Sequence, residues 1–188
     1  FPLQRPRREP RVRLLLLRTF GARRRSTRLL RDLTRQWRWV GSVELIIAPD
    51  LATEALSPDE LVDFISFRLP RRFVRDESMI GRRLESLDLR PDRDGRYRVN
   101  ELMSHDDTRL PTVEALMSNV DVILLDLRGF GPHNAGVVDE LERLAALVPL
   151  LKVVALVDET TDINAFRGAL WRAAAFAPPT SPLATDPF

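Results

Sequence analysis

The sequence predicts an α/β fold built around a mostly parallel sheet. Short runs of aliphatic residues alternate along the chain with segments in which apolar residues recur at helical spacing. The clearest unit is Asp121 to Arg143, where the run Val122 to Leu125 ends in Asp126, a loop with two glycines follows, and a helix begins near Asn134. A strand, a turn and a helix in that order are typical of parallel α/β proteins, whose sites lie where strands end.

Five segments have the length and composition of strands. They are Arg11 to Arg18, Ser42 to Ala48, Arg96 to Met103, Asp121 to Leu127 and Leu151 to Val157. The first contains four consecutive leucines, and the second, fourth and fifth are dominated by branched apolar residues, as strands buried on both faces are. The third alternates apolar and polar residues, which indicates a strand with one exposed face.

Helical spacing or capping residues predict helices between and after these strands. The expected helices cover Ser26 to Trp37, Ser57 to about Leu69, Arg71 to Leu87, Thr112 to Asn119, Asn134 to Val148 and Asp162 to Ala175. For the second, Ser57 is a capping residue and Pro58 suits the first helical position. Right-handed crossovers then cover both faces of the sheet. We therefore predict a flavodoxin-like three-layer sandwich with a five-stranded, mostly parallel sheet of order 2-1-3-4-5.

Length and composition indicate one globular domain with extensions. The 188 residues are 44% hydrophobic and 30% charged, and no apolar run approaches the roughly 18 residues that span a membrane. Residues 1–10 are interpreted as a basic linker, 11–176 as the α/β domain and 177–188 as a proline-rich disordered tail. The chain has no cysteine and two histidines, so we predict neither a metal nor a bound cofactor.

The net charge of +2 hides a strong asymmetry along the chain. Residues 1–40 hold 13 arginines and two acidic residues, a balance of +11, whereas the remainder holds 16 basic and 25 acidic residues, a balance of −9. The basic part begins with Arg5, Arg7, Arg8 and Arg11. It is consistent with a segment next to an anionic membrane leaflet, with a solvated tail followed by an amphipathic helix, or with nucleic-acid binding. A single lysine among the 29 basic residues indicates a compositional bias, which weakens any argument from the arginine count.

The predicted strand order places a pocket beside the loops after the first, third and fourth strands. The first loop, Arg18-Thr19-Phe20-Gly21, matches neither the dinucleotide fingerprint nor the Walker A sequence, although Arg18 and the next helix start could hold a phosphate. In the second, His105 beside Asp106 could act as a general base or metal ligand, or Asp106 could simply cap a helix. In the third, glycines precede Asn134, a suitable N-cap.

One carboxylate could work in this pocket. On the helix from Asn134, the residues Val137, Leu141, Leu144 and Val148 form an apolar stripe. Glu140 and Glu142 flank the stripe at about 100° on either side. Periodicity does not decide which of the two faces the pocket, and both could be solvated.

The segment from Asp121 to Leu144 resembles the nucleoside 2-deoxyribosyltransferase and Toll/interleukin receptor (TIR) group. The resemblance lies in an apolar strand ending in an acid, a glycine-bearing loop with Asn134, and a helix with the pattern G-x-x-x-E-L from Gly136 to Leu141. In that group a helix glutamate acts on the N-glycosidic bond of a nucleoside or NAD. The resemblance assigns this role to Glu140 and implies NAD or a nucleotide as ligand. It places around the ligand the residues Arg18, Thr19, Phe20, Asp126, Arg128 and Asn134.

The whole chain also resembles the cytosolic part of uncharacterised bacterial membrane proteins. The similarity lies in the segments Asp94 to Leu102 and Asp126 to Phe130. It implies no activity, but it implies a place next to a membrane.

Two functions from different classes follow. The first is a cytoplasmic TIR-like signalling or interaction module at the inner face of the cell membrane, tethered by a segment upstream of Phe1, held to anionic lipid by the basic segment, and able to form a homo-oligomer. The alternative is an N-glycosidic-bond enzyme, a NAD hydrolase or deoxyribosyltransferase-like protein that uses Glu140. Nucleic acid is disfavoured as a partner, because Trp37-Arg38-Trp39 is most simply a helix-end tryptophan and a packing residue.

Overall fold

The computed structural model describes residues 12–18, 31–33, 35–47 and 73–176. The expected linker over 1–10, the expected tail over 177–188 and the expected helix from Ser57 lie outside these ranges.

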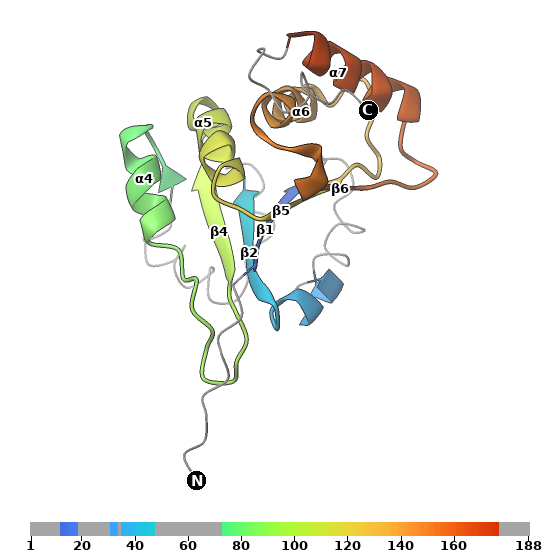
Figure 1. Ribbon diagram of the computed structural model, residues 1–188. Helices are drawn as coiled ribbons and strands as arrows, with labels where there is room; N and C mark the ends of the chain where they lie inside the picture. The colour runs from blue at the N-terminus through green and yellow to red at the C-terminus, as the bar shows by residue number, and fades with distance from the viewer. Residues whose placement is uncertain (1–11, 19–30, 34, 48–72, 177–188) are drawn as a thin grey trace, which may run out of the picture.

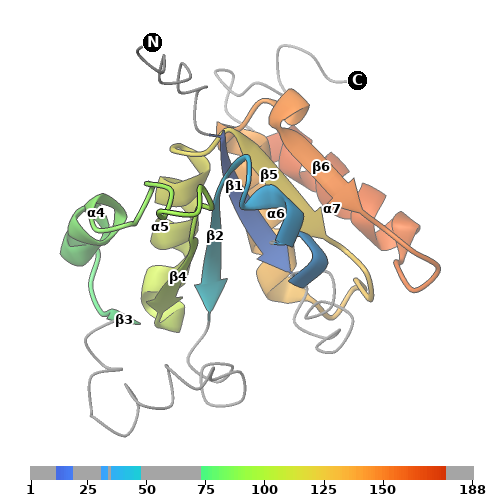
Figure 2. The same cartoon turned by 90° about the horizontal axis from the view of Figure 1, so that it is seen from below.

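A parallel sheet forms the centre of the molecule (Figures 1 and 2). Its strands are β1 (Val12–Arg18), β2 (Gly41–Ile47), β3 (Phe73–Val74), β4 (Val99–Ser104), β5 (Val122–Asp126) and β6 (Val153–Leu156). All pairs are parallel and the order is β3-β4-β2-β1-β5-β6. The α/β, flavodoxin-like fold class is confirmed, with the two-residue β3 added to the five expected strands.

The expected strand order is wrong. The third expected strand, β4, pairs with the outer side of β2 instead of lying between β1 and β5, so the five expected strands have the order 3-2-1-4-5. Glu101 is exposed on β4, close to the sheet edge, where its carboxylate stays in contact with water. The point where the chain reverses direction across the sheet is therefore between β1 and β5.

Helices cover both faces of the sheet. On one face lie α4 (Ser78–Glu85), α5 (Asp106–Met117), α6 (Ala135–Leu147) and α7 (Ile163–Phe176). Residues 31–33 and 35–37 are helical and lie on the opposite face, as Figure 2 shows. The short 3-10 helix Leu150–Lys152 leads into β6.

Two helix expectations need correction. The helix expected over Thr112 to Asn119 begins six residues earlier, because α5 starts at Asp106 and keeps Pro111 inside it. The helix expected over Arg71 to Leu87 is divided into β3 and α4. A two-residue strand is too short to produce a period that sequence analysis can detect.

The four leucines of β1 divide between two apolar clusters. Leu15 and Leu17 pack with α5, α6 and α7 in the larger cluster, whereas Leu14 and Leu16 pack with Val43, Leu45 and the helical residues Leu33 and Trp37. The alternation places each leucine on the face opposite to its neighbour. At the sheet edge, β6 is less covered, and Val154 is 53% exposed.

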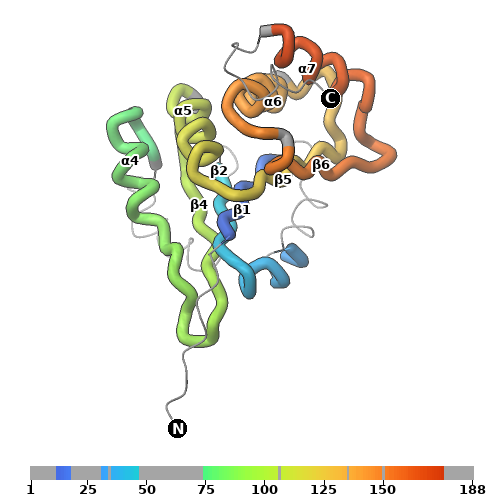
Figure 3. The backbone as a smooth tube through the Cα atoms, viewed as in Figure 1, coloured from blue at the N-terminus to red at the C-terminus, as the bar shows by residue number. Residues whose placement is uncertain are grey.

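The amino end of the sheet depends on a close backbone approach at Gly41. Gly41 pairs in register with Val12, and a Cβ at Gly41 would lie 1.6 Å from the Val12 carbonyl oxygen. At the same end, the loop between α4 and β4 extends past the sheet beside the turn that precedes β2 (Figure 3).

We expect Gly41→Ala to lower the free energy of unfolding by about 3 kcal/mol, because the new methyl group must push the first two strands apart. Gly81→Ala is the matched control. It lies inside α4 with nothing within 4 Å of its Cβ position, and should raise stability by about 0.5–1 kcal/mol. Urea unfolding measures both, and a Gly41→Ala protein as stable as the parent would contradict the close approach.

Candidate functional site

The carboxyl ends of β1 and β5 meet where the chain reverses direction across the sheet. Arg18 is in register with Asp126 on the neighbouring strand. Asp126 is buried, and its two oxygens accept hydrogen bonds from Arg128 Nε at 2.7 Å and Arg128 Nη2 at 2.9 Å. This pairing raises the pKa of Arg128. The Asp126 carboxylate therefore holds the loop that follows its own strand.

The loop after β5 is folded tightly by its own polar groups. Gly129 has φ of 75°, a backbone conformation that favours glycine. Asn134 is the N-cap of α6, as expected, but its side chain makes no cap hydrogen bond. Instead, Asn134 Oδ1 accepts a hydrogen bond from the Gly131 N–H at 2.8 Å. Asn134 thus braces the loop.

Glu140 is the inward-facing glutamate of α6. Its side chain is 2% exposed, whereas Glu142 is exposed, so the structure decides a choice that periodicity left open. Arg109 reaches across from the first turn of α5 and donates a hydrogen bond from Nη2 to Glu140 Oε1. Burial raises the pKa of Glu140, and Arg109 opposes that shift.

His105 and Asp106 lie away from the end of β5 and the loop that follows it. They follow β4, and the strands β2 and β1 separate β4 from β5. Three strand spacings correspond to about 14 Å. His105 is exposed and is itself the N-cap of α5, without a side-chain cap bond. The wrong strand order removes the reason for expecting the loops after β4 and β5 to share one pocket. Thr19, Phe20 and Gly21 and the side chain of Arg18 lie outside the described part of the chain.

Sequence analysis missed a buried charged cluster between β1 and β2. Glu44 is fully buried, and its Oε1 accepts hydrogen bonds from Arg13 Nε and Ser42 Oγ, both at 3.0 Å. Burial raises the pKa of Glu44, and Arg13 opposes the shift. The signal was present in the sequence, since Glu44 lies in the middle of the apolar run SVELII. An acid there needs a cationic partner.

Sequence analysis also missed a basic pocket at the amino end of the sheet. The cavity measures about 550 Å³ and is lined by Arg31, Arg35, Gln36, Arg38, Trp39 and Arg96. Trp37 packs against the smaller core cluster, as expected of a helix-end tryptophan. Trp39 was expected to pack as well, but it is 54% exposed, and the guanidinium of Arg96 lies 4.8 Å from its ring centroid. Sequence analysis could not place Arg96 in this pocket, because Arg96 is far in the sequence from the other lining residues, Arg31 to Trp39.

No family model matches the chain, and neither a curated protein nor a solved structure is significantly similar to it. The fold therefore defines the class: a parallel α/β domain with flavodoxin-like character. Among the described residues, no helix has the length and apolar character needed to cross a membrane.

We expect Arg109→Ala to cost about 3–5 kcal/mol at neutral pH, because it leaves the Glu140 carboxylate buried without its cation. The raised pKa of Glu140 gives the pH dependence. Glu140 contributes fully to stability below its pKa in the unfolded chain, 4.5. This contribution is lost as the pH rises through its higher pKa in the folded protein. The cost of Arg109→Ala should therefore shrink as the pH falls, because a protonated Glu140 needs no counter-charge.

Urea unfolding at several pH values measures this dependence. Arg143→Ala is the matched control, since its ion pair with Glu114 joins the same two helices but Arg143 is 52% exposed. It should cost less than about 1 kcal/mol. Equal losses of unfolding free energy for the two variants would contradict the prediction, because the buried ion pair would then contribute no more than the exposed one.

Proposed function

We propose that the chain is an interaction module that associates with an anionic membrane surface through the amino end of its sheet. The observation that carries the proposal is the composition of that end. The turn Arg38–Val40 leads into Gly41, which pairs with Val12, the first residue of β1. The basic residues Arg5, Arg7, Arg8 and Arg11 directly precede Val12 in the sequence.

Exposed apolar side chains accompany these arginines. Trp39 is 54% exposed and its neighbour Val40 is 52% exposed. Tryptophan is favoured at membrane interfaces, where its ring meets acyl chains and its N–H meets polar groups. Each arginine near an anionic surface adds about 1 kcal/mol to binding. An arginine-rich end with an exposed tryptophan therefore suits a peripheral contact with anionic lipid.

The proposal locates the domain in the cytoplasm at the inner face of the cell membrane, where anionic lipids attract basic segments. A role in TIR-like signalling is supported by the strand, loop and helix from Asp121 to Leu144. The remaining faces are then available to partners, including a second copy of the chain. Trp171 on α7, which is 70% exposed, offers one such apolar contact.

We expect the chain to sediment with vesicles of mixed phosphatidylcholine and phosphatidylserine and not with pure phosphatidylcholine. Binding should fall steeply between about 0.1 M and 1 M salt, because screening shortens the reach of the arginines. Replacing Arg5, Arg7, Arg8 and Arg11 together with glutamine should weaken binding. The same number of replacements at exposed arginines of other surfaces, Arg75, Arg82, Arg167 and Arg172, is the control. Binding that ignores lipid charge would contradict the proposal.

The N-glycosidic-bond enzyme is the second candidate, and one observation favours it: Glu140 is a buried carboxylate of raised pKa, as many catalytic acids are. The contact with Arg109 counts against it. A glutamate that attacks or stabilises a sugar carbon needs an oxygen facing that carbon, whereas Arg109 occupies Glu140 Oε1 and the side chain is 2% exposed.

We accordingly expect the purified chain to consume neither NAD nor nucleosides, alone or bound to anionic vesicles, when substrate is followed by chromatography. Turnover that Glu140→Gln abolishes while the variant remains folded would reverse the ranking of the two candidates. Glu142→Gln, an exposed glutamate on the same helix, is the matched control.

A further inference from the structure

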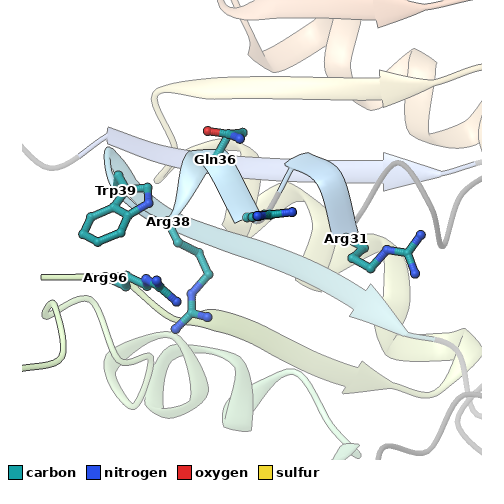
Figure 4. A pocket seen from close by; sticks show the side chains of 6 residues that line it. Arg31, Gln36, Arg38, Trp39 and Arg96 are labelled. Carbon is teal, nitrogen blue, oxygen red and sulfur yellow. The ribbon is translucent and has the colours of Figure 1, made fainter. Parts of the chain in front are cut away.

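The basic pocket combines positive charge with a concave, partly open volume. Four of its six lining residues are arginines, the other two are Gln36 and Trp39, and none is acidic. Figure 4 shows Arg38, Trp39 and Arg96 gathered at one end of the pocket, with Arg31 at the other. A volume of about 550 Å³ lies within the range that small organic ligands occupy.

Two hydrogen bonds fix the turn that carries Arg38. The Tyr97 N–H donates to the Arg38 carbonyl oxygen at 2.7 Å, and Arg38 Nε donates to the Tyr97 carbonyl oxygen at 2.5 Å. The turn before β2 is thereby joined to the segment that leads into β4. Arg38 Nη2 also lies 4.0 Å from Asp92 Oδ2, and the Arg38 side chain is 32% exposed.

Arg96 and Trp39 form the second fixed part of the pocket. The Arg96 guanidinium lies over the Trp39 ring at 4.8 Å from the centroid. Behind the ring, Gly95 has φ of 86°, and a Cβ there would lie 3.7 Å from the indole. Arginine stacked on an aromatic ring retains its in-plane N–H groups for an anion. The pocket is thus built by segments from both sides of the β2–β4 pair.

Asp92 and Asp94 lie near the pocket, and each contacts one of its arginines. Asp92 lies 4.0 Å from Arg38 Nη2, but it accepts hydrogen bonds from Arg98 at 2.8 and 3.1 Å, and Arg98 also pairs with Asp88. Asp94 lies 3.6 Å from Arg96 and is mostly exposed. The four lining arginines outnumber these two carboxylates, so the pocket has a net positive charge.

We propose that this pocket binds the phosphate group of an organic phosphate, with Arg35, Arg38 and Arg96 as donors and Trp39 against the organic part. Guanidinium groups match phosphate in geometry as well as charge, since two parallel N–H groups can meet two oxygens. The ligand is either a soluble phosphate ester or a phosphorylated lipid headgroup. The inference shares a surface with the proposed membrane contact but does not depend on it, because a soluble phosphate would bind without a membrane.

Titration of the full chain with pyrophosphate and with inositol trisphosphate tests the proposal. Trp39 should report binding by a saturable change in fluorescence, and calorimetry gives the stoichiometry. Arg35→Ala and Arg38→Ala should each weaken binding by about tenfold or more, since each removes charge-assisted hydrogen bonds. Arg35→Ala is included because Arg38→Ala also removes the hydrogen bond to the Tyr97 carbonyl oxygen, so a loss with Arg38→Ala alone could reflect misfolding. Trp39→Phe should remove the fluorescence change, and Arg167→Ala, an exposed arginine of α7, is the matched control.

The outcomes separate this site from the membrane proposal. If the pocket variants lose the soluble phosphates but still bind vesicles that contain phosphatidylinositol phosphates, the site takes a soluble ester. If they lose those vesicles and still bind phosphatidylserine vesicles, the site takes a phosphorylated headgroup. Either result supports the site. Absence of saturable binding to both probes overturns it, whatever the vesicles show. So does an equal loss in Arg167→Ala, or pocket-dependent binding of an oligothymidine strand when neither probe binds.

Discussion

The burial of β1 on both faces is the constraint on which the rest of the structure depends. Its four leucines alternate between two apolar clusters, each covered by helices. Complete burial of a leucine side chain contributes about 2 kcal/mol. Because β1 lies between β2 and β5 and all three run in parallel, the carboxyl ends gather at one edge and the amino ends at the other. The polar groups of the molecule are sorted by this arrangement into two separate regions.

Two groups of arginines among the described residues serve different purposes. Arg13, Arg109 and Arg128 each meet a buried carboxylate, and their charge compensates an acid that water cannot reach. Those around Trp39 line an open cavity without an acid in its wall. A count of arginines in the sequence cannot distinguish the two groups. Only the partner of each side chain does so, and that partner lies on another strand or helix.

Local pattern was enough to predict most of the elements. The strands from Asp121 and Leu151 and the helix from Asn134 lie within about two residues of their expected bounds, because each has a clear period and a clear boundary signal. The strand order was not accessible, since it depends on which strand β4 pairs with, and a local pattern does not specify that partner. Periodicity also could not decide whether Glu140 or Glu142 is buried, because Arg109, the ion-pair partner of the buried glutamate, comes from another helix.

The candidate sites show the same division between local and tertiary information. Asp126 and Asn134 were rightly placed at the end of a strand and the start of a helix, yet their side chains bond to their own loop. The orientation of a short polar side chain follows from loop backbone geometry, which the sequence does not specify. Trp39 was expected to pack because tryptophan usually does, but the turn that carries it points the ring toward Arg96.

The pairing of β1 with β5 has a consequence for the order of events as the chain is made. The Arg13 N–H donates to the side chain of Asp121, a residue 108 positions later. During synthesis, at about 5–20 residues per second, the leucine strand must wait several seconds or more for its second neighbour. For that interval one side of an apolar strand has no ladder partner, and contacts of such long separation also slow refolding. Nascent chains of this protein should therefore need shielding by a chaperone more than a helical bundle of equal length would.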